Sequence, residues 1–486
     1  MSRAVAPDTS QKLSVFSSQY LSITLSALTL LALAAFDGMA VAAALPRIGA
    51  DLGVSRLPWV LTSFALTSTL ALLIAGPAID ALGVRLVFRF TIAVFFLGSL
   101  LCAIAPTLEV LIAARIVQGV GGGLVMAVTI SNVGITYPPE LRPRAFAANS
   151  TVWGVMALAG PAAAAFMLNV VSWRGIFFVS VPLVAIAAIV GWNRMGTDQF
   201  SRHEMTVDRR GVTILGLFVS VMLIGLSELR WWSAVLVGVG AVLMGVYWVH
   251  SGRAESPVLA RRHFASFPFG LLNLVPFAFF AGPVSIDAFI PVYVQGALGK
   301  GTTVSAFAVA FLAIGWTLGS QIVSRLLDRV KNTTVMVAGF VIALPSLSLA
   351  MTFGTATPVA LIFSLSFVQG FGIGSITNAT LSLLQRVAPS EEMGRVSAAH
   401  QFLRNFGVTV GTASTGAIIL FVVSRRLGSV EPVQRLLKGK DAALSAPTRE
   451  AIAAGFRAAA TLAFTLTCIG FVVALRVRNR FSKLEP

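Results

Sequence analysis

Charged residues are scarce in this chain of 486 amino acids: only 11% are Asp, Glu, Lys or Arg, and 19 acidic residues stand against 36 basic ones. Because a soluble globular domain carries roughly 25% charged residues, this composition argues against soluble enzymes, nucleic-acid binders and disordered scaffolds. Cysteine occurs only as Cys102 and Cys468, both in apolar stretches, so no disulfide or metal framework is implied. Hydrophobic residues make up 56% of the chain and the mean hydropathy is +0.86, which indicates a polytopic integral membrane protein.

Apolar stretches long enough to cross a bilayer, about 20 residues each, recur along the chain. Fourteen such stretches are found, and an even number places both termini on the same side. They lie near 20–45, 58–79, 86–105, 109–131, 146–168, 174–193, 212–227, 232–250, 267–295, 303–324, 333–352, 357–385, 396–423 and 451–475. A polar tail precedes the first stretch and no small-residue cleavage site follows it, so we expect a retained helix.

Lys and Arg are distributed unequally between the two sides of the membrane. Most of them fall in the tails and in the loops on the N-terminal side, and the outer loops carry a concentration only in segment 424–450. The positive-inside rule therefore predicts that both termini are cytoplasmic.

The chain contains an internal repeat at an offset of about 250 residues. Val117-Gln118-Gly119 recurs as Val368-Gln369-Gly370, Asp37 matches Asp287, and Asp80 matches Asp328. We expect a cytoplasmic tail (1–19), a six-helix bundle (20–194), a linker with two extra helices (195–266), a second six-helix bundle (267–476) and a cytoplasmic tail (477–486). Duplicated helical halves around a midplane site are typical of secondary transporters.

Several ordered motifs resemble the major facilitator superfamily, specifically its fourteen-helix drug:proton antiporter branch. They are Asp37-x-x-x-Val41-x-x-Ala44-Leu45-Pro46, Gly76-x-x-x-Asp80-x-x-Gly83-x-Arg85, Arg115-x-x-Gln118-Gly119, Gly154 with Gly160-Pro161, and Trp173-Arg174 before Val181-Pro182. The resemblance implies an all-α fold of two six-helix repeats plus two inserted helices, placed in the bacterial inner membrane. It also implies alternating access driven by protons, with no cofactor.

Charges inside the apolar stretches need a reason, since each costs at least ~2.5–3.5 kcal/mol at the bilayer centre. Asp37 and Arg115 lie at compatible depths in their helices. Desolvation favours a protonated carboxyl group and a nearby guanidinium favours the carboxylate, so a contact that is made and broken would take up and release a proton. We predict proton coupling by Asp37, Arg115 and, second, Asp287; the alternative for Asp37 and Arg115 is a static structural pair, and Asp287 could be simply hydrated.

An inner gate is predicted at the cytoplasmic loop ends, where Asp80 and Asp328 sit beside Arg85 and Arg329. A carboxylate there can cap a neighbouring helix N-terminus and pair with arginine. Gly76 and Gly83 belong to the same motif. The alternative is that these are ordinary solvated charges that set the topology.

Three residues on the fifth stretch, Gly154, Gly160 and Pro161, have a mechanical interpretation. Small residues allow close helix approach, and proline permits a bend by removing a hydrogen bond; packing alone is the alternative. For the substrate cavity we propose Gln118, Arg404 and His400, although a lone histidine is more often a polar packing residue.

Motifs for enzymes are missing: the sequence has no His-Glu-x-x-His, no phosphate-binding loop with lysine and no Cys/His cluster, so we expect no catalytic or metal-binding residues. The leading hypothesis is a proton-coupled exporter of lipophilic small molecules or drugs, acting in the bilayer, without nucleic acid, as a monomer. The alternatives are an exporter of one specific lipid or natural product, and a passive facilitator or membrane sensor with the same fold.

Overall fold

The computed structural model of the chain is built from helices. It describes residues 14–53, 57, 59–196, 208–227, 231–429 and 444–481, and no strand lies within these ranges. The first group of helices is α1 (Leu21–Leu52), α2 (Trp59–Leu82), α3 (Val84–Ala103), α4 (Leu108–Thr136), α5 (Arg142–Val170) and α6 (Trp173–Gly191). α7 (Arg209–Ser227), α8 (Trp231–Ser251) and the short α9 (Arg262–Ala265) follow.

The second group starts with a helix in three pieces, α10 (Phe269–Ala281), α11 (Pro283–Asp287) and α12 (Ile290–Gly296). It continues with α13 (Thr302–Leu326), α14 (Asn332–Ala350), α15 (Val359–Val387), a 3₁₀ turn (Ser390–Glu392), α16 (Met393–Leu427) and α18 (Ala446–Phe481). Sequence analysis predicts one continuous helix over 267–295. The chain breaks at Gly282 because Pro283 has no N–H to continue the hydrogen-bond ladder.

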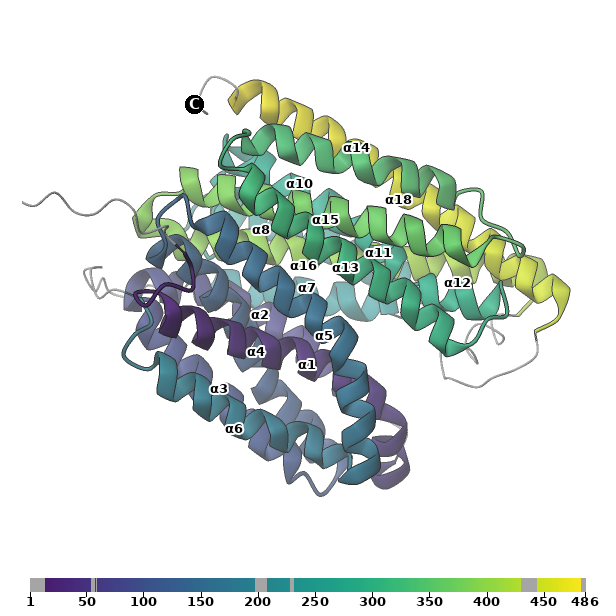
Figure 1. Cartoon of the computed structure of the whole chain (residues 1–486), viewed down its shortest axis with the longest axis horizontal. Coiled ribbons are helices and arrows are strands. Elements are labelled where there is room, and N and C mark those ends of the chain that lie inside the picture. Colours follow the sequence, from purple (N-terminus) through teal and green to yellow (C-terminus); the bar gives the residue numbers. More distant parts are fainter. Residues whose placement is uncertain are drawn as a thin grey trace, which may run out of the picture.

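The two groups form separate lobes that lie side by side (Figure 1). Each lobe has its own apolar core: Leu30, Phe88 and Val125 lie in the first, and Phe279 and Phe340 in the second. The lobes converge at the end where α18 finishes and diverge at the other. We call the convergent end, which carries Asp80 and the start of α16, the terminal end, and its opposite the distal end.

Twelve helices in the described ranges are long and apolar enough to cross a membrane, or up to thirteen if the bent helix α5 counts as one span. α5 bends by 43° between Arg142–Gly160 and Ala162–Val170, at the proline of the motif. α7 is helical but is not among these spans. The count of fourteen spans expected from the sequence therefore stays a prediction. It requires α7 to cross the membrane as well.

The inserted pair α7–α8 packs against the seam between the lobes. Leu215 and Phe218 of α7 share a buried cluster with Leu73 of α2 and Phe402 of α16, and Phe218 and Phe406 have ring centroids 5.0 Å apart. The insert thus covers one edge of the interface where α2 and α16 meet.

Candidate functional site

Asp37 and Arg115, from α1 and α4, form a buried ion pair. The distance from Arg115 Nη1 to Asp37 Oδ2 is 2.6 Å, and the side chains are 0% and 1% exposed for Arg115 and Asp37. Arg115 Nε also donates to the carbonyl of Val60 on α2 at 3.1 Å, so the guanidinium connects three helices. A buried pair is costly unless its polar atoms find further partners. The neighbouring Gln118 bonds Arg115 Nη1 and the second oxygen of Asp37, whereas Arg115 Nη2 has no hydrogen-bond partner among the described residues.

Gln118 completes the cluster around Asp37. Its Nε2 donates to Asp37 Oδ1 at 3.0 Å and to Ser99 Oγ at 3.0 Å, and its Oε1 accepts from Arg115 Nη1 at 2.7 Å. The guanidinium lies 4.1 Å from the ring centroid of Phe64 and 5.9 Å from that of Phe177. Sequence analysis assigns Gln118 to the substrate cavity; the structure places it with the ion pair, fully buried in the first lobe.

Asp287 occupies the matching position in the second lobe with a different environment. Gln369, the repeat partner of Gln118, donates through Nε2 to Asp287 Oδ1 at 2.7 Å and to the carbonyl of Pro283 at 3.1 Å. Ser366 stands where the repeat would place the counterpart of Arg115. Among the described residues Asp287 Oδ2 has no hydrogen-bond partner, so this carboxyl group is buried without a cation beside it.

Arg404 lines a small pocket of about 40 Å³ between the lobes, which we call the central pocket. Side chains from α1, α4, α5, α13, α15 and α16 surround it, among them Trp153 and Trp316. The guanidinium of Arg404 lies 5.0 Å from the ring centroid of Phe280. Sequence analysis identifies Arg404 here but misses Asn149, Thr377 and Gln401, because single polar residues in apolar helices do not reveal which face they occupy.

His400 lies one turn before Arg404 but takes a structural position. Its Nδ1 is 3.1 Å from Asn273 Oδ1, and Asn273 Nδ2 donates to the carbonyl of His263 at 3.0 Å. These bonds connect α16 to α10 and α9, and His400 is not among the residues that line the central pocket.

Asp80 joins the two lobes at the terminal end. Its Oδ1 accepts from the backbone N–H of Gly394 at 2.6 Å, and its Oδ2 accepts from that of Arg395 at 2.9 Å. The carboxylate therefore caps the N-terminus of α16, as expected, whereas the neighbouring arginine is Arg395, with Nε 3.9 Å from Oδ2. Arg85, in the first turn of α3, donates to the carbonyls of Met195 and Gly196 after α6; the residue before that helix, Gly83, has φ +81°.

Gly76 permits this capping contact. A Cβ on Gly76 would lie 2.9 Å from Cα of Arg395 and 2.9 Å from Cβ of Ala398, distances that real Cβ atoms do not show. Glycine at position 76 of α2 is therefore what lets α16 approach closely enough for its first N–H groups to reach Asp80.

Asp328 makes the symmetry-related connection. Its Oδ2 lies 2.7 Å from Arg144 Nη2, and Arg144 is the repeat counterpart of Arg395. The partner is thus Arg144 of the first lobe; the exposed Arg329 is its chain neighbour. In each case an aspartate of one lobe contacts the start of a helix in the other lobe, and that helix carries an arginine in its first turn. Pairing with an arginine nearby in the chain would not connect the two lobes.

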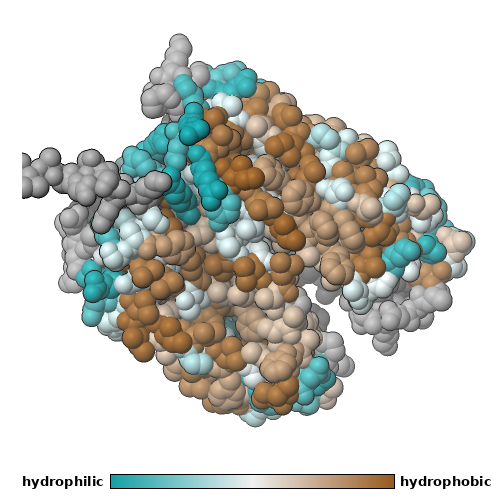
Figure 2. Space-filling model, in the orientation of Figure 1, coloured by the Kyte–Doolittle hydropathy of each residue, from teal (hydrophilic) through white to brown (hydrophobic). Residues whose placement is uncertain are grey.

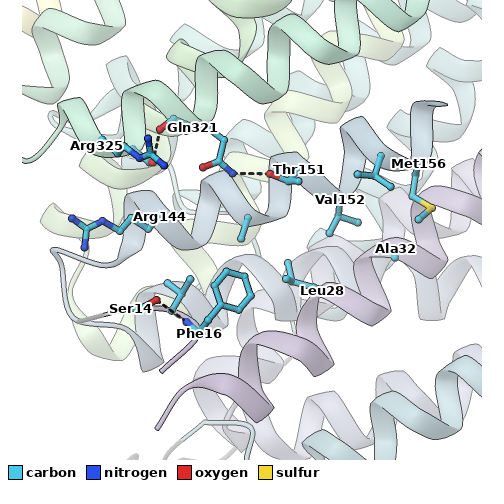
Figure 3. A pocket seen from close by; sticks show the side chains of 14 residues that line it. Ser14, Phe16, Leu28, Ala32, Arg144, Thr151, Val152, Met156, Gln321 and Arg325 are labelled. Atoms are coloured by element: carbon cyan, nitrogen blue, oxygen red, sulfur yellow. Dashed lines mark hydrogen bonds between the residues drawn. The ribbon is translucent and has the colours of Figure 1, made fainter. Parts of the chain in front are cut away.

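Further bonds close the seam along α5 and α13. Gln321 Nε2 donates to Thr151 Oγ1 at 2.7 Å, beside a crevice of about 450 Å³ lined by α1, α5 and α13 and opening near Phe16 (Figure 3). Gly154 faces Thr317 across the same seam, and a Cβ on Gly160 would lie 3.3 Å from Met39 Sδ of α1. The interface is closed at the terminal end, whereas the space-filling view is hollowed between the lobes at the distal end (Figure 2).

Comparisons with known proteins agree with this architecture. The family model of the Major Facilitator Superfamily matches residues 27–412. The chain is 27% identical over 394 residues to the multidrug transporter protein MdtP of Bacillus subtilis, covering 79% of this chain and 72% of that protein. It is 30% identical over 395 residues to a probable multidrug-efflux transporter of Mycobacterium tuberculosis, covering 77% and 82%. The solved proton:xylose symporter XylE superposes with a TM-score of 0.61 at 14% identity, over 94% of this chain and 95% of XylE, a likeness of fold alone.

Proposed function

The chain belongs to the Major Facilitator Superfamily, and from this membership we propose that it exports lipophilic small molecules in exchange for protons by alternating access. It is a membrane transporter and not an enzyme. Relatives named as multidrug transporters support a drug-like cargo. Export of one specific lipid or natural product is the second candidate within the same fold.

The observation that carries the proposal is the buried cluster of Asp37, Arg115 and Gln118. Within the described ranges, the hydrogen bonds that Asp37 accepts come from side chains and not from backbone groups: Arg115 Nη1 at 2.6 Å and Gln118 Nε2 at 3.0 Å. Protonation of Asp37 removes the negative charge that holds the guanidinium. The carboxyl group can therefore alternate between a paired carboxylate and a neutral acid, which is what proton exchange requires.

A route from this proton site to the interface runs through α1. Met39 follows Asp37 by two residues and faces Gly160 of α5, where a Cβ would lie 3.3 Å from Met39 Sδ, directly before the 43° bend. α5 in turn packs against α13 across the seam at Gly154 and Thr317. A change in the pairing of Asp37 can thus alter the position of α5, one of the helices of the first lobe that pack against the second.

The inner gate is proposed to hold the conformer that is closed at the terminal end. Two of its connections are Asp80 of α2, which caps α16, and the ion pair of Asp328 with Arg144. Both must separate when the lobes rock and the cargo site opens to the cytoplasm. We place the terminal end, with both termini, on the cytoplasmic side of the bacterial inner membrane, in line with the distribution of Lys and Arg. In this proposal α7 crosses the membrane as the fourteenth span and the transporter works as a monomer.

The test is Asp37→Asn in proteoliposomes with an imposed pH gradient. Two dyes that share one ring frame, cationic rhodamine 6G and anionic fluorescein, serve as cargo. We expect uphill transport to be lost because the asparagine cannot release a proton, while binding of the dyes persists. Asp51→Asn is the matched control: Asp51 lies on the same helix, accepts a hydrogen bond from Trp173 Nε1 at 2.8 Å and should leave coupling intact.

Other outcomes separate the alternatives. Uphill transport by Asp37→Asn at the wild-type rate would place the proton site elsewhere, with Asp287 next. Loss of dye binding together with poor expression would favour a static pair. Dye movement by the unmodified protein that ignores the pH gradient would indicate a passive facilitator. Accumulation of a labelled lipid without either dye would favour the second candidate.

A further inference from the structure

The central pocket lies on the axis that relates the two lobes. Residues about 250 positions apart line it in pairs, as a repeat predicts for an axial site. The pairs are Met126 with Thr377, Ile130 with Leu381, Ser150 with Gln401, and Trp153 with Arg404. Both halves of the repeat therefore contribute the same backbone positions to one cavity.

The side chains on this axis are unequal. At three of the four pairs the second lobe supplies the longer or more polar group: threonine for methionine, glutamine for serine and arginine for tryptophan. Since the positions are equivalent, the difference comes from the side chains and not from the fold. It makes one wall of the pocket polar and cationic and the other largely aromatic and apolar.

Four buried polar atoms at this pocket lack a hydrogen-bond partner among the described residues. They are Asn149 Nδ2, Thr377 Oγ1, Gln401 Oε1 and Arg404 Nε. Two of the four, the amide and guanidinium nitrogens, can only donate, the threonine hydroxyl can do either, and the oxygen of Gln401 can only accept. Three of the four atoms can therefore donate to a ligand. Unpaired buried polar atoms are costly, so their collection in one cavity indicates a ligand group rich in acceptors.

The charge of Arg404 has no counter-ion in the described part of the chain. The lobe aspartates are engaged elsewhere, Asp37 with Arg115 and Asp287 with Gln369. The guanidinium lies over the aromatic ring of Phe280. A cation inside the membrane normally pairs with an anion or faces a water-filled cavity, and this one faces the space between the lobes.

We propose that the central pocket binds the anionic head group of an amphiphilic cargo, a carboxylate or a similar oxyanion, through Arg404, Asn149 and Thr377. This rests on the export function proposed above and assigns its substrate class. A volume of about 40 Å³ admits such a head group only, because a drug-sized molecule needs roughly 300 Å³ or more. The aromatic body therefore extends beyond the pocket, past the indoles of Trp153 and Trp316 that line it.

The experiment measures binding of fluorescein and rhodamine 6G to the purified full-length protein in detergent, by fluorescence anisotropy and without a pH gradient. The dyes have the same xanthene frame and opposite charge. The unmodified protein is expected to bind fluorescein more tightly. Arg404→Gln should weaken fluorescein binding about tenfold or more, the scale of one charge-assisted hydrogen bond, and leave rhodamine 6G unchanged or tighter.

Two further variants keep the inference falsifiable if Arg404→Gln does not fold. Thr377→Val preserves shape and removes the hydroxyl, so it should weaken fluorescein binding severalfold without affecting rhodamine 6G. Arg425→Gln makes the same chemical change on α16 beside Phe421, away from the pocket, and should leave both affinities as they are. Equal binding of the two dyes, or fluorescein binding that neither Arg404→Gln nor Thr377→Val weakens, overturns the inference.

These results are distinguishable from those for proton coupling. Fluorescein binding that depends on Arg404, in a protein that shows no proton-driven export, refutes the proposed function and keeps the head-group site. Proton-driven export of rhodamine 6G, with no effect of Arg404→Gln on dye preference, refutes the head-group site and keeps the proposed function.

Discussion

Asp80→Asn is the sharpest test of the inner gate. In the structure both carboxylate oxygens accept hydrogen bonds from backbone N–H groups at the start of α16, at 2.6 and 2.9 Å. Asparagine has nearly the same shape but only one acceptor oxygen and no charge. The substitution therefore removes one of the two bonds, weakens the other, and removes a negative charge from a helix N-terminus.

The size of the effect follows from these contacts. A hydrogen bond to a charged group contributes about 1.5–3 kcal/mol and a neutral one about 1 kcal/mol, while a charge at a helix N-terminus adds about 0.3–1 kcal/mol. The lower ends of these ranges add up, so the conformer closed at the terminal end should lose at least about 2 kcal/mol relative to the open one. Such a difference changes the ratio of the two conformers by about thirtyfold or more.

The assay is double electron–electron resonance between spin labels at Glu140 and Glu391, exposed positions of the two lobes at the terminal end. The half-buried Cys468 is replaced beforehand, whereas Cys102 is buried and can stay. We expect a population at longer distance that is small in the unmodified protein and dominant in Asp80→Asn. Proton-coupled transport should fall while insertion into the membrane is unaffected.

Asp328→Asn is the control for charge alone. Asp328 and Arg144 are 38% and 39% exposed, and an exposed pair contributes about 0–1 kcal/mol because water screens it. Its distance distribution should change much less than that of Asp80→Asn. An unchanged distribution for Asp80→Asn, or an equal shift for Asp328→Asn, would refute the capping contact as the main connection.

Three other predictions follow from the packing and the topology. Gly394→Ala should open the terminal end in the same distance measurement, because the new Cβ would lie 2.6 Å from the carbonyl oxygen of Gly76 and would also clash with the carboxylate of Asp80. An unchanged distance distribution would contradict the close approach of α2 and α16. Ser366→Arg gives Asp287 the cation that its counterpart has, so we expect it to change the number of protons moved per cargo molecule without affecting dye binding, as measured by proton and dye fluxes in proteoliposomes. A cysteine at Ser233 should be labelled by an impermeant reagent from outside, and one at His250 only from inside; the reverse result would invert the insert.

Much of the fold follows from the sequence because the bilayer restricts what a chain can do. Apolar length predicts the helices, and the repeat predicts two equivalent lobes. Membership of the superfamily is confirmed by the match over residues 27–412. The contact between Asp37 and Arg115 could be predicted from the sequence for a related reason. Charges deep in the membrane are few, and each needs a partner at its own depth. The break at Gly282 is marked in the sequence by the Gly282-Pro283 pair, but apolar length alone predicts one helix over 267–295.

By itself, the sequence determined which segments form helices and which few charged residues lie within them. Only the tertiary structure decided which of these charged and polar side chains contact one another. Asp80 caps a helix that starts more than three hundred positions away, and Asp328 pairs with Arg144, although each has an arginine close by in the chain. Gln118 lies with the buried ion pair of Asp37 and Arg115, and Asn149 and Thr377 line the central pocket. Hydropathy sets the depth of a residue along a helix, but the rotation and tilt of that helix set the face, and these depend on packing against helices distant in sequence.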